Sequence, residues 1–104
     1  SGGVQKLPDE LCNLSELRIL KVSCCSRLRT LPKSLGDLAR LEEAELKWNG
    51  LTTLPASVGD LTALKKLWIA DNKLKSLPPS ILDLTGCKFD MKKRDLQALV
   101  ERHK

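Results

Sequence analysis

The sequence predicts an α/β solenoid built from stacked repeats. We expect a short parallel β-sheet on its concave face, turns or 3-10 segments on its convex side, and a capping helix at its C-terminal end. Three observations support this prediction. A Leu-Pro dipeptide recurs at intervals of 24, 23 and 23 residues, apolar residues occupy matching columns in every copy, and the apolar spacing becomes helical near the end of the chain. One structural unit is therefore repeated.

Length and composition fit one domain of this kind. The chain has 104 residues, of which 41% are hydrophobic, and leucine supplies most of these because there are two Trp, one Phe and no Tyr. No apolar run approaches the roughly 20 residues that a membrane helix needs, so we expect no membrane association. The net charge of +5, from 18 basic and 13 acidic residues, is mostly interspersed and favours acidic partners only weakly.

The repeat is clearest when the Leu-Pro copies, which begin at Leu7, Leu31, Leu54 and Leu77, are laid over one another. Six columns then hold only apolar residues: Leu11, Leu35, Val58 and Ile81; Leu14, Leu38, Leu61 and Leu84; Leu17, Leu41 and Leu64; Leu20, Ala44 and Leu67; Val22, Leu46 and Ile69; Leu28, Leu51 and Leu74. The alternation between the fourth and fifth columns has the period of a strand with one buried face. Short parallel strands should therefore stack at Val22, Leu46 and Ile69.

Asn49 and Asn72 follow the predicted strands, and Cys25 stands in the equivalent place. Residues 64–74 have the sequence LKKLWIADNKL, which fits LxxLxLxxNxL at every fixed position. On these residues the chain resembles leucine-rich-repeat proteins with 23-residue LxxLxLxxNxLxxLPxxLxxL units, over about residues 4–87. It is similar to the Ras-group intracellular proteins, plant immune receptors and bacterial effectors of this class. In that family the asparagine bonds neighbouring turns into a ladder, so Asn49 and Asn72 are expected to carry that role, while the Cys25 thiol fills the space but bonds weakly.

Residues 88–104 are expected to form the C-terminal cap. Asp90 falls in the column of Leu20, Ala44 and Leu67, where a core strand would not accept a carboxylate, so the strand pattern should fade at Phe89. From Lys92 onward, the spacing predicts a helix with Asp90 as its N-cap. Its apolar face should hold Leu96, Leu99, Val100 and His103.

The N-terminal end is expected to lack a dedicated cap. Ser1, Gly2 and Gly3 resemble residues left from cloning, and the repeat then starts in the middle of a unit. Two interpretations stay open. Either the chain is cut from a longer array, or the strand edge between Leu17 and Ser23 is partly open and pairs with another copy of the molecule.

Residues between the core positions of the predicted strands should face a ligand on the concave face. They are Arg18, Ile19, Lys21, Ser23 and Cys24; Glu43, Glu45, Lys47 and Trp48; and Lys66, Trp68, Ala70 and Asp71. We predict partner binding by Arg18, Lys21, Glu43, Glu45, Trp48, Lys66, Trp68 and Asp71. Trp48 and Trp68 are expected on adjacent strands as an aromatic anchor, with packing on neighbouring aliphatic stems as the alternative. The charged residues either orient a partner or form ordinary cross-strand pairs.

No residue pattern indicates catalysis, a metal site or a cofactor. The cysteines, Cys12, Cys24, Cys25 and Cys87, form neither a CxxC motif nor a cluster with histidine, so free thiols in a reducing compartment are expected. A single histidine argues against a Ser or Cys triad. Gly36, Gly59 and Gly86 match no phosphate-binding loop and should serve backbone conformation. Lys92, Lys93 and Arg94 are interpreted as solvated surface, with a phosphate or acidic-partner site as the alternative.

The sequence therefore predicts a non-enzymatic module that binds a partner protein through its concave face, as the family resemblance implies. We expect it in the cytoplasm, or in a host cytoplasm if it is a delivered effector. Two alternatives remain: the substrate-recognition part of a larger enzyme such as an effector ubiquitin ligase, and a fragment with no partner of its own. Binding of nucleic acid or an anionic membrane is disfavoured, because Glu43 and Glu45 would face such a ligand.

Overall fold

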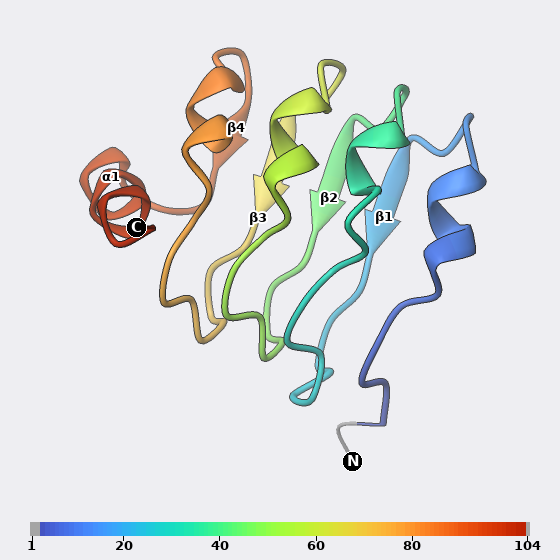
Figure 1. The fold of residues 1–104 in the computed structure, drawn as a ribbon, viewed down its shortest axis with the longest axis horizontal. Coiled ribbons are helices and arrows are strands. Elements are labelled where there is room, and N and C mark those ends of the chain that lie inside the picture. Colours follow the sequence, from blue (N-terminus) through green and yellow to red (C-terminus); the bar gives the residue numbers. More distant parts are fainter. Residues whose placement is uncertain (1–2, 104) are drawn as a thin grey trace.

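The computed structural model describes residues 3–103 and shows a solenoid of stacked turns (Figure 1). Each turn contributes one strand to a parallel sheet with the order β1–β2–β3–β4. The strands are Ile19–Lys21 (β1), Glu43–Glu45 (β2), Lys66–Trp68 (β3) and Lys88–Phe89 (β4). Four 3-10 helices lie on the convex side: Asp9–Asn13 (η1), Leu35–Asp37 (η2), Ala56–Asp60 (η3) and Pro79–Asp83 (η4). The α-helix Lys93–Glu101 (α1) follows β4. This arrangement confirms the predicted fold class.

The convex segments are short because each one follows a Leu-Pro step and ends at a leucine. Pro8, Pro55 and Pro78 precede η1, η3 and η4 in an extended conformation, with φ between −68° and −66°. Each 3-10 helix is then closed by a leucine N–H that donates to the carbonyl three residues back, at Leu14, Leu38, Leu61 and Leu84. The proline thus blocks helix formation before it, and the leucine turns the chain toward the next strand.

The core lies between the sheet and the 3-10 helices and is built from the apolar columns. Its fully buried members include Leu28, Leu38, Leu41, Leu51, Val58 and Ile69. The first turn is less well covered: Leu14 is 51% exposed, and Leu11, Leu17 and Val22 are only half-buried. The reason is that β1 pairs only with β2 and forms one edge of the sheet.

Strand β4 corrects the register that was predicted for the last turn. Phe89 pairs with Leu67, so Phe89 and not Asp90 occupies the apolar column. The physical reason is one missing residue. Cys87 and Leu64 are equivalent, because their N–H groups donate to the carbonyls of the equivalent leucines Leu84 and Leu61. Phe89 lies two positions after Cys87, whereas Leu67 lies three positions after Leu64. The strand ends at Phe89, as expected, but the placement of Asp90 in the apolar column is wrong.

Helix α1 covers the end of the core beyond β4. It buries Leu96, which is 5% exposed, and packs Leu99 and Val100 against the core as half-buried residues. The carbonyl of Leu99 also accepts a hydrogen bond of 3.1 Å from the backbone N–H of Leu77. The helix is therefore attached to the last turn by both apolar contacts and a backbone hydrogen bond.

Two details of the predicted cap are wrong. Asp90 is not the N-cap of α1, because its carboxylate is engaged by the preceding turn; Lys92 holds the N-cap position and makes no side-chain capping bond. His103 lies beyond the last residue of α1 and is exposed, so it does not belong to the apolar face. No helix within residues 3–103 is long and apolar enough to span a membrane.

Gly36 and Gly59 allow close packing of neighbouring 3-10 helices, which differs from the backbone role expected of them. A Cβ atom on Gly36 would lie 2.3 Å from the carbonyl oxygen of Ser57, and one on Gly59 would lie 2.6 Å from Cβ of Ser80. Neither glycine needs a left-handed φ. In the last turn the equivalent residue is Leu82, which is 48% exposed and has no following 3-10 helix against it.

The Gly36→Ala substitution should lower the free energy of unfolding by about 1–3 kcal/mol, because the backbone of the next turn must move to admit the methyl group. Leu82→Ala changes the equivalent exposed position and should alter stability by about 0.5 kcal/mol or less. Urea unfolding followed by circular dichroism would compare the two variants. Equal losses of stability would contradict the close-packing explanation.

Candidate protein-interaction surface

A buried asparagine joins the first and second turns just after their strands. Asn49 is 6% exposed, and its Nδ2 donates to the carbonyls of Val22 and Leu46, both at 2.9 Å. Its Oδ1 accepts a hydrogen bond of 2.9 Å from the backbone N–H of Cys25. One side chain thus satisfies backbone groups of two turns that burial would otherwise leave without partners.

Asn72 makes the equivalent bonds one turn later. Its Nδ2 donates to the carbonyls of Leu46 and Ile69 at 2.8 and 2.9 Å, and its Oδ1 accepts from the Leu51 N–H at 3.0 Å. Together, Asn49 and Asn72 form a ladder that fixes the path of the chain after β2 and β3.

Asp90 provides the last rung of this ladder. Its Oδ1 accepts hydrogen bonds from the N–H groups of Ile69 at 2.8 Å and Ala70 at 3.1 Å. An ionised carboxylate only accepts hydrogen bonds, so it suits a position where N–H groups need partners. Sequence reasoning missed this role because it placed Asp90 one position too early in the repeat.

Cys25 holds the ladder position of the first turn, but its thiol stays within that turn. Its Sγ lies 3.5 Å from the carbonyl oxygen of Ser23. The first turn has one residue more than the second between its ladder position and the next core leucine, because Leu28 lies three positions after Cys25 and Leu51 lies two after Asn49. This longer segment packs directly on the second turn, where a Cβ atom on Gly50 would lie 2.2 Å from the Ser26 carbonyl oxygen. The first two turns are therefore in close backbone contact.

Charged residues on the exposed face of the sheet pair across adjacent strands. Lys21 Nζ lies 3.3 Å from a carboxylate oxygen of Glu45, and Lys66 Nζ lies 3.5 Å from one of Glu43. Both carboxylates of β2 therefore have a basic partner within this chain. Exposed pairs of this kind contribute at most about 1 kcal/mol each to stability, so they mainly leave the middle of the face electrically balanced.

Trp68 lies on β3 and makes contacts within this chain. Its side chain is half-buried, and the Lys66 ammonium group lies 5.2 Å from the ring centroid. Such a cation–π contact stabilises by about 0.5–1 kcal/mol at an exposed site. In the register of the sheet, Trp68 also lies beside Glu45 of β2. Trp68 thus has a contact partner on its own strand and is half-buried even without a ligand.

Trp48 differs from Trp68 in position, exposure and backbone conformation. It does not lie on a strand as expected, because β2 ends at Glu45 and Trp48 belongs to the turn that follows. Its side chain is among the most exposed apolar groups, at 59%, and its φ is 60°. The left-handed conformation costs an L-residue roughly 1–2 kcal/mol. Folding therefore gives no reason for a tryptophan at this exposed, left-handed position.

The left-handed position recurs directly before each of Cys25, Asn49 and Asn72. Cys24 and Asp71 are the equivalents of Trp48, with φ of 61° and 60°, and both are exposed. Asp71 lies 4.0 Å from Lys47 Nζ. Arg18 lies before β1 and is exposed, and no carboxylate among residues 3–103 pairs with its guanidinium group. The structure thus groups the predicted residues into two sets, one on the strands and one in the turns.

Comparison with known proteins supports the leucine-rich-repeat fold. A model of the Leucine Rich Repeat family matches residues 63–84. The solved structure of a leucine-rich-repeat protein of Leptospira interrogans is similar to this chain, with a TM-score of 0.57, 28% sequence identity and coverage of 84% of this chain. The chain therefore has the leucine-rich-repeat fold and carries a recognisable repeat of this family at residues 63–84. It spans 28% of the length of the Leptospira protein, and a search of curated proteins finds no match to its sequence.

The cysteines of this leucine-rich-repeat protein are free thiols. Burial raises the pKa of the Cys87 thiol to about 11, so this group stays protonated at neutral pH and is a weak nucleophile. Within residues 3–103, no three His, Cys, Asp or Glu side chains are grouped so that they could hold a metal ion. The features that stand out are therefore those of a binding surface, above all Trp48.

Replacing Trp48 by asparagine should leave the free energy of unfolding unchanged or slightly higher, because asparagine tolerates the left-handed conformation and the indole is mostly exposed. Trp68→Asn should lower it by about 1 kcal/mol or more, because the packed indole and its cation–π contact are lost. Urea titrations of both variants would test this difference. A large loss of stability in the Trp48 variant would show that its indole supports the fold.

Proposed function

We propose that this leucine-rich-repeat protein binds a partner protein through its concave face, with Trp48 as the anchor of the interface. The leucine-rich-repeat fold is a general protein–protein interaction scaffold, which supports the class of function. The observation that carries the proposal is Trp48 itself, a large aromatic residue that is 59% exposed at a left-handed position that tryptophan does not favour. Large rigid aromatic residues dominate the energy of many protein interfaces.

The strand residues supply a second part of the proposed surface. Lys21, Glu43, Glu45 and Lys66 pair with one another and present a polar, nearly neutral area beside Trp48. A partner would meet an aromatic anchor next to groups that can exchange ion pairs for contacts across the interface. We place this binding in the cytoplasm or another reducing compartment, a proposal that the free thiols support.

The test begins with capture of partners from a lysate of the source cells and their identification by mass spectrometry. Trp48→Asn should then weaken the binding of a purified partner by about 30-fold or more, as expected when an interface hot spot is removed. Trp68→Phe should weaken it less. The matched control is Leu82→Asn, which removes an apolar side chain of 48% exposure from the convex side.

The binding data would have clear consequences. If Trp48→Asn and Leu82→Asn bind the partner as tightly as the unsubstituted protein, Trp48 is not the anchor of the interface. If only the Leu82 variant loses binding, the interface lies on the convex side near η4.

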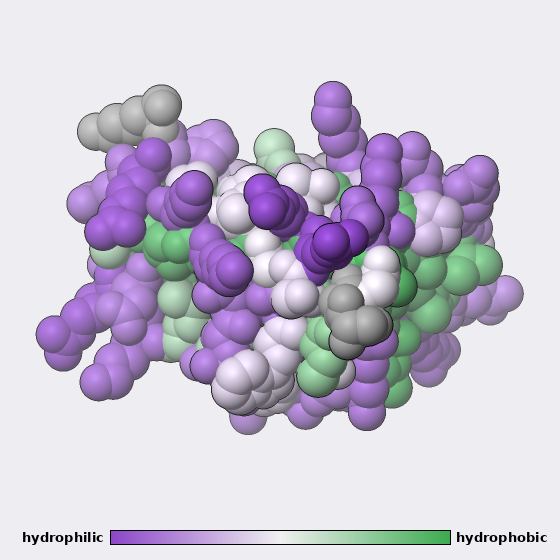
Figure 2. Space-filling model, turned by 90° about the horizontal axis from the view of Figure 1, so that it is seen from below, coloured by the Kyte–Doolittle hydropathy of each residue, from purple (hydrophilic) through white to green (hydrophobic). Residues whose placement is uncertain are grey.

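Self-association is a second candidate, and exposed apolar residues in the first turn favour it. Val4, Leu14 and Ile19 are 44%, 51% and 49% exposed, and Leu14 and Leu17 contribute to a hollow of about 420 Å³ there. Figure 2 shows hydrophobic colour gathered at this end of the molecule. Because β1 pairs with β2 on one side only, we propose that its other side pairs with β1 of a second copy. A two-fold axis would make this pairing antiparallel.

Sedimentation equilibrium should then show a monomer–dimer equilibrium that Leu14→Lys shifts toward the monomer by at least about tenfold, since a charge would enter the apolar contact. Leu82→Lys, a change of similar exposure at the other end of the solenoid, should leave the equilibrium unchanged. A protein that is monomeric at all concentrations, or a dimer insensitive to Leu14→Lys, would refute pairing through β1.

A further inference from the structure

The turns that follow β1, β2 and β3 lie side by side along one edge of the solenoid, the lower edge in Figure 1. We define this turn edge as residues 24–30, 48–53 and 71–76. Backbone hydrogen bonds link the turns directly: the Thr52 N–H donates to the Arg29 carbonyl at 3.0 Å, and the Lys75 N–H donates to the Thr52 carbonyl at 2.8 Å. The turn edge is therefore a continuous surface with a fixed spacing between its three turns.

Charge is distributed unevenly along the turn edge. The middle turn, WNGLTT, has no charged residue, whereas the outer turns carry Arg27 and Arg29 on one side and Lys73 and Lys75 on the other. All four cations are exposed. The acidic residue of the turn edge, Asp71, is already paired with Lys47 at 4.0 Å. An uncharged strip thus runs between two rows of cations, and most of the edge seen in Figure 2 is hydrophilic.

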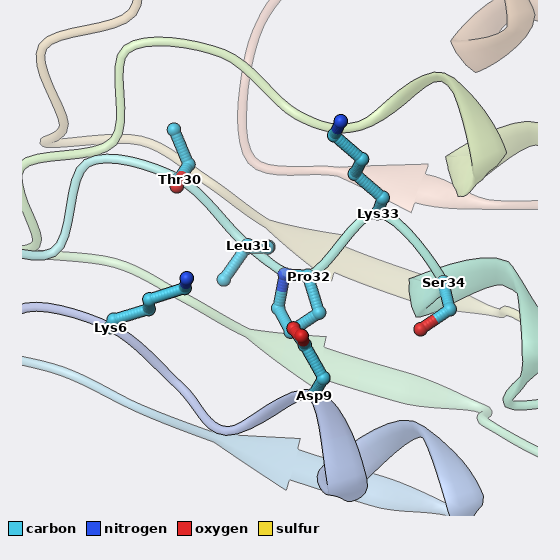
Figure 3. Close-up of a pocket in the computed structure, with 7 residues that line it drawn as sticks. All are labelled: Lys6, Asp9, Thr30, Leu31, Pro32, Lys33 and Ser34. Atoms are coloured by element: carbon cyan, nitrogen blue, oxygen red, sulfur yellow. The ribbon is translucent and has the colours of Figure 1, made fainter.

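Apolar contact sites lie at both ends of the uncharged strip. Trp48 stands at the end nearest the sheet and is 59% exposed. At the other end is a hollow of about 230 Å³, lined by Thr30, Leu31, Lys33, Thr53, Leu54 and Pro55. It adjoins a larger hollow of about 460 Å³, which shares Thr30, Leu31 and Lys33. Figure 3 shows Leu31 of this larger hollow between the side chains of Lys6 and Lys33.

We infer that the turn edge binds an extended, acidic peptide segment of the partner protein. One apolar side chain of the segment packs on Trp48, a second enters the hollow beside Leu54, and carboxylates between them face Arg29 and Lys75. Charge-assisted hydrogen bonds from arginine to carboxylate give such a contact both strength and direction. This inference rests on the proposed function, and it adds the chemistry of the partner and a surface beyond the strands.

An acidic peptide fits this surface better than a single-stranded nucleic acid, which could also use cations and an aromatic ring. Nucleic-acid grooves stack successive bases on several aromatic side chains. The described turn edge offers Trp48 alone. The next apolar site is a recess whose apolar lining is Leu31, Leu54 and Pro55, with no aromatic residue, which suits an aliphatic side chain.

The test uses the two tryptophan side chains as separate reporters in ¹H–¹⁵N correlation spectra of the ¹⁵N-labelled protein. The probe is a synthetic ten-residue peptide of glutamate and aspartate with two leucines. We expect it to shift the indole N–H signal of Trp48 and the amide signals of the turn edge, while the indole signal of Trp68 stays in place. A peptide with glutamine and asparagine in place of the acids should bind at least tenfold more weakly.

Matched variants distinguish binding at the turn edge from nonspecific attraction of the peptide to the positively charged protein. Arg29→Gln with Lys75→Gln should weaken peptide binding about tenfold or more. Lys92→Gln with Arg94→Gln removes the same two charges from exposed positions at the start of the structure's α-helix and should change binding less than twofold. Preserved spectra of both double variants would show that they fold.

Three results would overturn the inference: equal binding of the uncharged peptide, tighter binding of a ten-nucleotide oligouridylate, or equal weakening by both double variants. The proposed function is judged separately. Suppose that a captured partner needs Trp48 for binding but the acidic peptide does not shift the Trp48 signal. The proposed protein-binding function would then stand, and the proposal that the partner segment is acidic would be refuted.

Discussion

The rest of the structure depends on the hydrogen bonds that ladder side chains make to the backbone just after the strands. Each strand has only two or three residues, so the sheet itself fixes few backbone groups. Asn49 and Asn72 each bond to their own turn and to the turn before, which sets both the turn conformation and the stacking register. A buried polar group without a partner costs about 1–3 kcal/mol, so a slip of one residue between turns would be strongly disfavoured.

The ladder also explains how the solenoid ends. Asp90 accepts bonds from the N–H groups of Ile69 and Ala70, while the carbonyl groups of the same residues accept bonds from Asn72. A carboxylate therefore completes the last turn with acceptors alone. The missing residue before β4 brings Asp90 to this place and Phe89 into the core, and α1 then covers the apolar surface that remains.

Sequence patterns predict what every turn has in common and miss what depends on a single neighbour. The columns that contain Leu38, Leu41 and Leu51 are recognisable because burial recurs with the repeat. The register of Phe89 depends on one missing residue, which only backbone pairing reveals. A glycine is needed at position 36 because the carbonyl oxygen of Ser57, in the next turn, leaves no room for a Cβ atom. For the candidate site, the sequence could identify both tryptophans as candidate binding residues. It could not show that Trp68 contacts Lys66 or that Trp48 has a left-handed φ, because the repeat pattern specifies neither.

The position of Trp48 suits recognition because the ladder holds its backbone in place. Asn49 is the next residue along the chain and is bonded on both sides, so the left-handed turn persists even though tryptophan does not favour it. A large side chain with two rotatable bonds, carried on a fixed backbone, loses little conformational freedom when it binds. The equivalent residues Cys24 and Asp71 show that the turn itself requires no aromatic group. The scaffold thus leaves this position free to vary, and the proposed interface uses that freedom to present a tryptophan on a fixed backbone.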